Sequence, residues 1–382
     1  MGTNADVIVV GLGAMGSSAA MHLARRGVRV LGFDRFDIPN TMGSSHGHTR
    51  MIRLAYYEHP NYVPLLQRAY ELWHRLEQDS GRRLLYITGG LYIGSEHSRF
   101  VRGSLASAQA HTLPHELLSR SDLSRRYPQF HLPEGFTAMY EPNAGVLLSE
   151  RIVATQAELA SAGGAVLHAR EPVLRWEATP SGVRVQTTKD TYEAARLLLT
   201  AGAWNPALAG SLGPALKLTV TRQATAWFWP RRPEAFAEDR LPVWALSKDD
   251  GTIHYGFPML ADGNGGAGFK TAIHRLGEQT DPDHLDREPR AADEEPIRAF
   301  LRESLPEAQG PLLALRICMY TNTPDSHLLL DRHPEHENVF LASPCSGHGF
   351  KFASVVGEAV ADLLTAGSTE LPITFLRTTR FG

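Results

Sequence analysis

Residues 6–34 constrain the fold of this chain more than any other stretch, because they join an apolar strand, a glycine-rich turn and a helix. Residues 7–10 form a β-branched run, Val-Ile-Val-Val, typical of a buried parallel strand. Gly11, Gly13 and Gly16 follow with the spacing G-x-G-x-x-G. In this motif the first glycine makes a tight turn, the second admits a pyrophosphate, and the third lets helix and strand pack closely. The flanking elements favour a dinucleotide site over an ordinary glycine-rich turn.

Two further features extend this prediction. The helix that starts near Ala14 directs its N-terminal amides toward the phosphates. Asp34 ends a second strand, where a carboxylate accepts a hydrogen bond from a ribose hydroxyl. Residues 195–200 form a later buried strand that runs into Ala-Gly-Ala-Trp at 201–204. This is the usual form of a strand that returns to a FAD-type dinucleotide domain.

Length and charge bound the class of protein. At 382 residues the chain exceeds one typical core, so two domains are expected. A net charge of −3 argues against nucleic acid or an anionic membrane as the main partner. No Lys or Arg precedes the uncharged residues 7–24, and Gly and Ser interrupt them, so the fingerprint explains them better than a signal peptide does. No transmembrane span is expected.

The two cysteines, Cys318 and Cys345, are too few for a disulfide framework. One disulfide between them stays open, but a reducing, cytoplasmic setting is the expectation. Only five of the 38 basic residues are lysines. A lysine in a glycine-flanked, uncharged stretch is therefore a candidate for a role that needs a compact ammonium.

Hydrophobic periodicity and turn residues place the remaining elements. Residues 165–201 alternate as strands, residues 215–275 are expected to form antiparallel strands, and a strand at 86–93 is broken by Gly89 and Gly90. Residues 141–145 form a turn that crosses between domains. Helices are expected at 62–76, 98–127, 150–162, 295–303 and 352–364, with short strands at 328–331 and 339–342.

A second glycine-rich loop lies at residues 40–50. Its segment 43–47 matches G-x-S-x-G, the nucleophile elbow of hydrolases, but that motif needs a buried strand before it and a helix after it. Here a Pro-Asn loop precedes it, which argues against the elbow. The segment is either a solvated loop or a loop that lies against the cofactor, with Arg50 and Arg53 beyond it.

The C-terminal third carries two more candidates. Residues 347–351 precede a helix, whose positive dipole end suits a developing anion such as the N1/O2 side of a reduced flavin. A plain N-terminal cap is the alternative. Cys318 is either a small buried apolar residue or a thiolate that bonds a cofactor covalently. No metal is expected, because the close histidine pairs lack the helical i, i+4 spacing of a zinc enzyme: His46 with His48, and His333 with His336.

Several motifs spread along the chain match one family. They are the Gly11, Gly13 and Gly16 fingerprint, the loop 43–53, Asn-Tyr-Val-Pro at 61–64, Glu-Pro-Asn-Ala-Gly at 141–145, Tyr-Gly-Phe-Pro at 255–258, residues 270–274, Cys-Met-Tyr-Thr at 318–321, Asp-x-His-Pro-Glu at 331–335, and Ser-Gly-His-Gly-Phe-Lys-Phe at 346–352. On these residues the chain resembles the monomeric sarcosine oxidase and N-methyltryptophan oxidase family of flavin amine oxidases. The resemblance covers nearly the whole chain.

The resemblance implies a mixed α/β (α+β) fold. A Rossmann-type FAD-binding domain is expected from residues 1–84, 146–214 and 318–382. A discontinuous substrate domain, built on a mixed and largely antiparallel sheet, is expected from residues 85–145 and 215–317. We expect a cytoplasmic monomer.

The resemblance further implies FAD joined to Cys318 through a thioether at its 8α-methyl. The family oxidises secondary amines such as sarcosine and other N-methyl amino acids. A C–H next to nitrogen gives a hydride equivalent to the flavin, the imine hydrolyses, and O2 reoxidises the flavin with formation of hydrogen peroxide. The residues implied to bind FAD are Gly11, Gly13, Ala14, Met15, Gly16, Asp34, Arg35, Ser44, His46, Thr49, Arg50, Val173, Ala201, Gly202, Trp204, Cys318, Met319, Gly347, Gly349, Phe350 and Lys351.

Matching positions also imply the substrate site. Arg53 and Lys351 are expected to clamp the carboxylate, because a carboxylate taken out of water needs a charged partner. Lys270 is expected over the flavin, where an ammonium stabilises the negative charge that grows on oxygen. The other implied pocket residues are Tyr255, Tyr320 and His274 around the amine, Arg50 and His46 beside the ring, and Glu58 and Tyr56 at other positions of the pocket region.

Alternatives remain open at this point. Leu54 and Tyr57 flank Arg53, and Ser45, His48 and Cys345 depart from the family pattern, which leaves the substrate undecided. Within the same fold the chain could be an L-proline or L-pipecolate oxidase, or a deglycating fructosyl amine oxidase. A NAD-dependent dehydrogenase and a non-enzymatic FAD-binding module are the alternatives from other classes.

Overall fold

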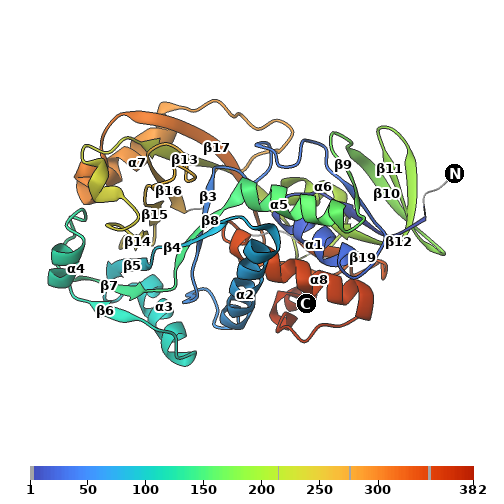
Figure 1. Ribbon diagram of the computed structural model, residues 1–382, viewed down its shortest axis with the longest axis horizontal. Helices are drawn as coiled ribbons and strands as arrows, with labels where there is room; N and C mark the ends of the chain where they lie inside the picture. Colours follow the sequence, from blue (N-terminus) through green and yellow to red (C-terminus); the bar gives the residue numbers. More distant parts are fainter. Residues whose placement is uncertain (1–3, 214, 275–276, 343–345) are drawn as a thin grey trace.

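The computed structural model describes residues 4–213, 215–274, 277–342 and 346–382. Two large β-sheets lie towards opposite ends of the long axis, and a small third sheet lies between them (Figure 1). Segments far apart in the sequence share each sheet, so the chain passes between the two halves several times.

The first sheet contains the glycine fingerprint. Its strand order is β10-β11-β12-β1-β2-β9, with β19 paired to β12 and β18 paired to β19. The fingerprint strand β1 (Asn4–Val10) runs parallel to both β2 (Val30–Phe33) and β12 (Thr191–Leu199). This is the predicted Rossmann-type core. The other strands are β9 (Val166–His168), β10 (Val173–Thr179), β11 (Gly182–Thr187), β18 (Leu330–Arg332) and β19 (Val339–Ala342).

Helices α1 (Ala14–Ala24), α5 (Ser149–Ala162) and α8 (Ala353–Ala366) form a layer against this sheet, and α2 (Tyr62–Ser80) packs on α8 (Figure 1). Side chains alternate along β1 as a pleated strand requires. Val7 and Val9 belong to the core shared with these helices, whereas Ile8 and Val10 belong to the core on the opposite face. Every residue of α1 is buried, because α5 and α8 both pack against it.

The second sheet has the order β17-β13-β16-β15-β14-β5-β7-β6 and is antiparallel except where β14 pairs with β5. Trp244 stacks on Phe300 of α7 with 5.7 Å between ring centroids, which ties helix to sheet. The strands are β5 (Gly90–Ser95), β6 (Glu116–Leu118), β7 (Phe136–Glu141), β13 (Thr219–Phe228), β14 (Val243–Ser247), β15 (Ile253–Phe257), β16 (Phe269–His274) and β17 (Leu312–Asn322). The helices in this half are α3 (Arg99–Ala110), α4 (Arg120–Arg126) and α7 (Ala291–Ser304).

The small third sheet joins the two halves. In it β8 (Gly145–Leu148) pairs antiparallel with both β3 (Thr49–Ile52) and β4 (Leu85–Ile87). The expected turn at residues 141–145 is present, and it leads from β7 of the second sheet into β8. The short helix α6 (Asn205–Leu208) follows β12.

Most expected elements are present, with two differences. The stretch 98–127, predicted as helical, contains β6 between α3 and α4, because Glu116–Leu118 pairs with β7. The strand expected at 86–93 is two strands in different sheets, divided at the predicted glycines. Strand β17 continues without a break through the expected domain boundary at 317/318. Cys345, expected to depart from the family pattern, lies outside the described residues.

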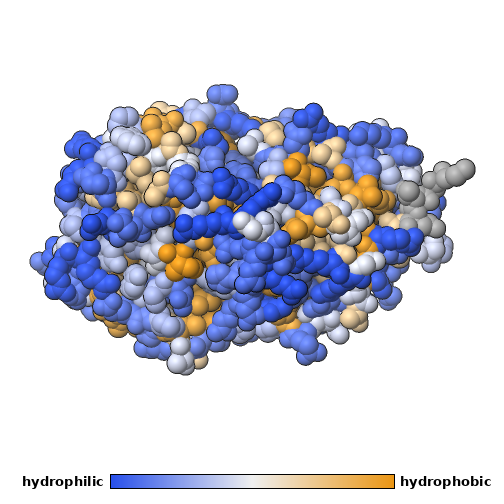
Figure 2. Space-filling model, in the orientation of Figure 1, coloured by the Kyte–Doolittle hydropathy of each residue, from blue (hydrophilic) through white to orange (hydrophobic). Residues whose placement is uncertain are grey.

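The visible face of the molecule is mostly hydrophilic, with scattered apolar areas (Figure 2). Within the described residues, no helix has the length and hydropathy needed to cross a membrane. The large apolar side chains that are exposed are Ile87, Leu117, Val166, Leu174, Trp229 and Leu313.

Candidate functional site

Both large sheets contribute walls to one cavity of about 510 Å³, a size typical of small-molecule sites. Of the residues expected to bind cofactor or substrate, Gly16 and Tyr56 do not line it. The expected residues that do line it are Gly11, Gly13, Ala14, Met15, Asp34, Arg35, Ser44, His46, Thr49, Arg50, Arg53, Glu58, Val173, Ala201, Gly202, Trp204, Tyr255, Lys270, His274, Cys318, Met319, Tyr320, Gly347, Gly349, Phe350 and Lys351.

The fingerprint glycines are required by close backbone approaches. Gly11 has a φ of +90°, and a Cβ there would lie 2.6 Å from the Cα of Ala201. A Cβ on Gly16 would lie 1.8 Å from the Gly11 carbonyl oxygen, so this glycine serves the packing of α1 on β1. Gly13 is the N-cap of α1 and has no side chain to cap the helix. The Ala14 amide donates to the Ser45 hydroxyl at 3.2 Å, and the positive end of α1 lies at the cavity, where it suits a pyrophosphate.

Asp34 stands just beyond β2 and is buried. Its carboxylate accepts hydrogen bonds from the backbone N–H of Leu12 (2.8 Å) and of Phe36 (2.9 Å). Burial raises the pKa of this carboxyl group, against the effect of the two bonds. The carboxylate thus fixes the glycine turn as well as facing the cavity, where a ribose contact remains a prediction.

The cavity wall holds buried polar atoms that have no partner among the described residues. Both ring nitrogens of His46 and the indole Nε1 of Trp227 are of this kind. Burial lowers the pKa of His46 to about 3, so the ring is neutral. Unpaired buried polar groups are costly. Their presence on this wall fits a polar ring system such as the isoalloxazine of FAD.

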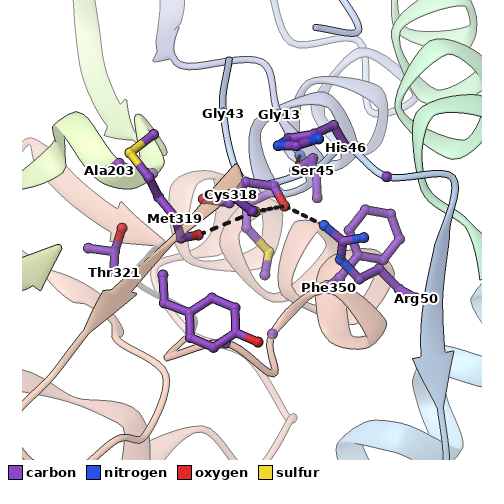
Figure 3. Close-up of a pocket in the computed structure, with 18 of the residues that line it drawn as sticks. Gly13, Gly43, Ser45, His46, Arg50, Ala203, Cys318, Met319, Thr321 and Phe350 are labelled. Atoms are coloured by element: carbon purple, nitrogen blue, oxygen red, sulfur yellow. Dashed lines mark hydrogen bonds between the residues drawn. The ribbon is translucent and has the colours of Figure 1, made fainter. Parts of the chain in front are cut away.

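Cys318 and Arg50 converge on this part of the cavity (Figure 3). Arg50 donates to the Ser44 carbonyl oxygen at 2.7 Å, and the Cys318 sulfur lies 4.0 Å from the same oxygen. Cys318 is a free, buried thiol on β17. The loop that contains the G-x-S-x-G match therefore lies against the cavity, and no strand directly precedes it.

Lys270 is buried on β16, and its ammonium is fully engaged. Its Nζ donates to the carbonyl oxygens of Gly47 (2.8 Å) and Thr49 (2.7 Å) and contacts the Thr49 hydroxyl at 3.1 Å. It also lies 4.6 Å from the ring centroid of Phe257 and 5.4 Å from that of Trp227. Burial lowers the pKa of Lys270 well below its usual value, and nearby Arg50 lowers it further.

Two more cations, Arg53 and Lys351, line the same cavity. Arg53 donates to the Ala55 carbonyl oxygen at 2.6 Å and pairs with both carboxylate oxygens of Glu58 at 3.2 Å. Burial is the largest single effect and lowers the pKa of Arg53, but Glu58 together with Tyr92, Tyr56 and Tyr57 raises this pKa above its usual value. Lys351 donates to the His348 carbonyl oxygen at 2.7 Å and lies 3.4 Å from the Tyr56 hydroxyl.

Tyr255, Tyr320 and His274 also meet at the cavity. Burial raises the pKa of both tyrosines, so their hydroxyls stay protonated. The His274 ring lies 5.6 Å from the ring of Tyr320, and burial lowers the pKa of His274 to about 4. This group therefore presents neutral donors and acceptors beside the Arg53–Glu58 ion pair and Lys351.

Several lining residues were not among those expected from the sequence. Trp227 lies in the stretch 215–275, which was expected to form antiparallel strands. At another part of the cavity, Asp283 accepts hydrogen bonds from Arg35 (2.8 Å) and from the Trp204 indole (2.7 Å). Only tertiary contacts bring Asp283 here, so the sequence carried no signal for it. Within the described part of the chain, no group of three or more His, Cys, Asp or Glu side chains could hold a metal ion.

Known proteins resemble this chain over its whole length. The family model described as FAD-dependent oxidoreductase (DAO) matches residues 6–363. "Monomeric sarcosine oxidase" of Streptomyces avermitilis is 42% identical over 370 residues, which cover 96% of this chain and 95% of the relative. "N-methyl-L-tryptophan oxidase" of Yersinia pestis is 34% identical, covering 93% and 94%. The solved structure of NikD, titled "an unusual amino acid oxidase essential for nikkomycin biosynthesis", has a TM-score of 0.85 at 26% identity, covering 98% and 97%.

Proposed function

The chain belongs to the FAD-dependent oxidoreductase family, together with the monomeric sarcosine oxidases and N-methyl-L-tryptophan oxidases, and from this premise we propose its reaction and site. Family membership makes it a flavin-dependent amine oxidase. We propose that it oxidises the secondary amine of a small N-methyl amino acid, sarcosine first, with O2 as acceptor. The products are an amine, an aldehyde and hydrogen peroxide.

One observation carries this proposal. A glycine-rich dinucleotide turn, a free buried thiol and three separately held cations line a single cavity. The turn suits a dinucleotide, and Arg53 and Lys351 suit a carboxylate. Lys270, which the backbone of Gly47 and Thr49 holds in place, suits a second anion. A NAD-dependent dehydrogenase gives Cys318 and Lys270 no joint role.

FAD, when bound, accepts a hydride equivalent from the C–H beside the amine nitrogen and passes the electrons to O2. Arg53 and Lys351 bind the substrate carboxylate in a site from which water is largely excluded, and this orients the amine. The neutral Tyr255 and His274 line the amine position. The surrounding cations lower the pKa of the bound amine, so the reactive neutral form is favoured. Lys270 stabilises negative charge that develops on oxygen.

Cys318 is the residue proposed to hold the cofactor covalently, through a thioether to the flavin 8α-methyl. A covalent flavin survives unfolding, so acid-precipitated protein should keep its yellow colour. The Cys318→Ala variant should release its flavin into the supernatant under the same treatment. A colourless wild-type pellet would contradict the covalent link, but it would not contradict FAD binding at this site. We further propose a monomeric, cytoplasmic enzyme, because two cysteines are too few for a disulfide framework.

A peroxide assay over a panel of amines tests the reaction itself. The panel holds sarcosine, N-methyl-L-tryptophan, L-proline, L-pipecolate and a fructosyl amino acid. We expect amine-dependent peroxide with N-methyl amino acids and none with amines that lack a carboxylate. Turnover of L-proline or the fructosyl compound alone would select the corresponding alternative oxidase. Flavin binding without peroxide from any amine would support a non-enzymatic FAD-binding module.

A further inference from the structure

Strand β3 connects the oxygen site to the carboxylate site. The loop before it and its own first residue supply two carbonyl oxygens that bind the Lys270 ammonium, those of Gly47 and Thr49. The chain after it carries Arg53, whose guanidinium donates to the Ala55 carbonyl oxygen. Both cations therefore depend on where the backbone at each end of β3 is held.

Glu150 holds the end before β3. It lies in the first turn of α5, and its carboxylate accepts from two successive backbone amides, those of Gly47 (2.7 Å) and His48 (2.9 Å). The Ser149 hydroxyl also donates to it at 2.7 Å. Burial works against the charge, but these hydrogen bonds lower the pKa of Glu150 to about 2. An ionised carboxylate is therefore built into the loop that binds Lys270.

Glu141 holds the end after β3 in the same manner. It ends β7, is 1% exposed, and accepts from the backbone amides of Leu54 (2.7 Å) and Ala55 (3.0 Å). The Tyr92 hydroxyl donates to the same carboxylate. Arg53 lies 5.6 Å from the centroid of the Tyr92 ring, so the carboxylate, the ring and the guanidinium form one assembly.

We propose that Glu150 and Glu141 are two positioning residues with separate duties, Glu150 for Lys270 and Glu141 for Arg53. The inference rests on the proposed function, in which Lys270 serves oxygen reduction and Arg53 serves substrate binding. The continuous segment of β7, the turn, β8 and the start of α5 contacts the chain at both ends of β3 and keeps the two sites in register.

The charge of Glu150 matters as well as its shape, whereas burial raises the pKa of Glu141 against the effect of the Tyr92 hydroxyl and the two backbone amides. A carboxylate offers lone pairs on both oxygens to successive N–H groups, whereas a glutamine offers one oxygen and turns an amide N–H toward a backbone N–H. Glu150 is also the anion that counters burial of the Lys270 ammonium. The other titratable or charged groups that face Lys270 are Arg50, Arg316, Cys318, His46 and His48.

The matched variants Glu150→Gln and Glu141→Gln separate the two duties in the holoenzyme, because each serves as the control for the other. In Glu150→Gln, flavin reoxidation by O2 should slow by roughly tenfold, the lower limit for outer partners of a functional group. Anaerobic reduction by sarcosine and binding of propionate, followed by flavin absorbance, should change less than twofold. Glu141→Gln should show the reverse pattern, with propionate affinity reduced by roughly tenfold. Glu158→Gln, on the exposed side of α5, should change neither.

A second measurement determines the pKa of Lys270 without turnover. The chain has five lysines, so Cε-labelled lysine gives few NMR signals, and Lys270→Met assigns the one of interest. The pKa of Lys270 should fall in Glu150→Gln and stay unchanged in Glu141→Gln. Glu150→Asp keeps the charge and should restore most of the wild-type pKa, which separates the charge from a general structural effect.

The outcomes distinguish the two claims. Equal effects of both glutamine variants on reduction and reoxidation, or an unchanged Lys270 pKa in Glu150→Gln, would overturn the division of duties. A lowered Lys270 pKa with normal reoxidation would uphold the positioning by Glu150 and contradict the proposed oxygen role of Lys270. Should a glutamine variant fail to fold, Ser149→Ala and Tyr92→Phe carry the same comparison, because each removes one hydroxyl donor from Glu150 or from Glu141.

Discussion

At the scale of single residues, Lys270 shows how the fold keeps a cation in an unfavourable place. Burial disfavours the ammonium, and Arg50 adds like charge. Two carbonyl oxygens, a hydroxyl and two aromatic rings offset part of this cost, because each interacts favourably with positive charge. A preorganised charge of this kind needs no reorganisation when an anion forms beside it.

Replacing Lys270 by Met tests this role, since Met keeps the length and apolar stem but removes the charge. Reoxidation by O2 should slow by about 10²–10³-fold, the effect of removing one preorganised stabiliser of a developing anion. Anaerobic flavin bleaching by sarcosine should stay nearly intact. Stopped-flow absorbance measures both steps, and Lys248→Met, which breaks an exposed pair with Glu303, is the control. Equal loss in both half-reactions would contradict the assignment.

Arg53 differs from Lys270, because its guanidinium forms an ion pair with a carboxylate, that of Glu58. The Arg53→Ala variant should weaken binding of propionate by about 2–5 kcal/mol, as expected for loss of one partner of a buried charged pair. Titration followed by flavin absorbance measures the affinity. Arg53→Lys keeps the charge and should recover part of the loss. Unchanged affinity in the alanine variant would show that residues other than Arg53 bind the carboxylate.

At the scale of elements, the sequence predicted those whose pattern is local and missed those made by pairing. The β1, α1 and β2 unit was predictable because the apolar run, the glycines and the helix signal are adjacent in the chain. The strand β6 was missed within a stretch predicted as helical, because only its pairing with β7 makes it a strand. The Lys270 ligands were equally hidden, since backbone carbonyls carry no sequence signal. The hydrogen bonds that Glu141 and Glu150 accept from backbone amides at the two ends of β3 were hidden for the same reason.

Gly16→Ala tests the contact between helix and strand that the fingerprint predicted. The added Cβ would lie 1.8 Å from the Gly11 carbonyl oxygen, so α1 must shift away from β1. We expect a loss of about 1–3 kcal/mol in stability, as for overpacking a well-packed core. Thermal melting of the apoprotein measures it. Gly43→Ala, whose Cβ would meet only the Asn40 side chain at 3.6 Å, should melt at nearly the wild-type temperature.

At the scale of the whole molecule, the cavity is built from segments distributed over most of the chain. Residues 10–15, 200–204 and 347–351 come from the end of the first sheet, whereas Lys270, Tyr255 and Cys318 stand on strands of the second sheet. The sequence predicted this division into two sheets, and nearly all of the residues predicted for the site line the cavity, but many other lining residues, such as Trp227 and Asp283, were not predicted. It did not predict that β17 carries Cys318 as a strand of the second sheet, because that placement depends on pairing with β13.

A ligand that touches both sheets should couple their unfolding. The Cys318→Ala variant, in which FAD binding is expected to be reversible, allows calorimetry with and without cofactor. Free FAD at a thousand times its Kd should stabilise the protein by about 4 kcal/mol, as mass action requires for a ligand bound only to the native state. Because both sheets contribute to the cavity, all of the unfolding heat should move to higher temperature with FAD.

ADP, which fits only the dinucleotide end, should move only the part that belongs to the first sheet. If FAD also shifted only one part of the unfolding heat, the cofactor would be bound by one half of the molecule, contrary to the site proposed between the two sheets.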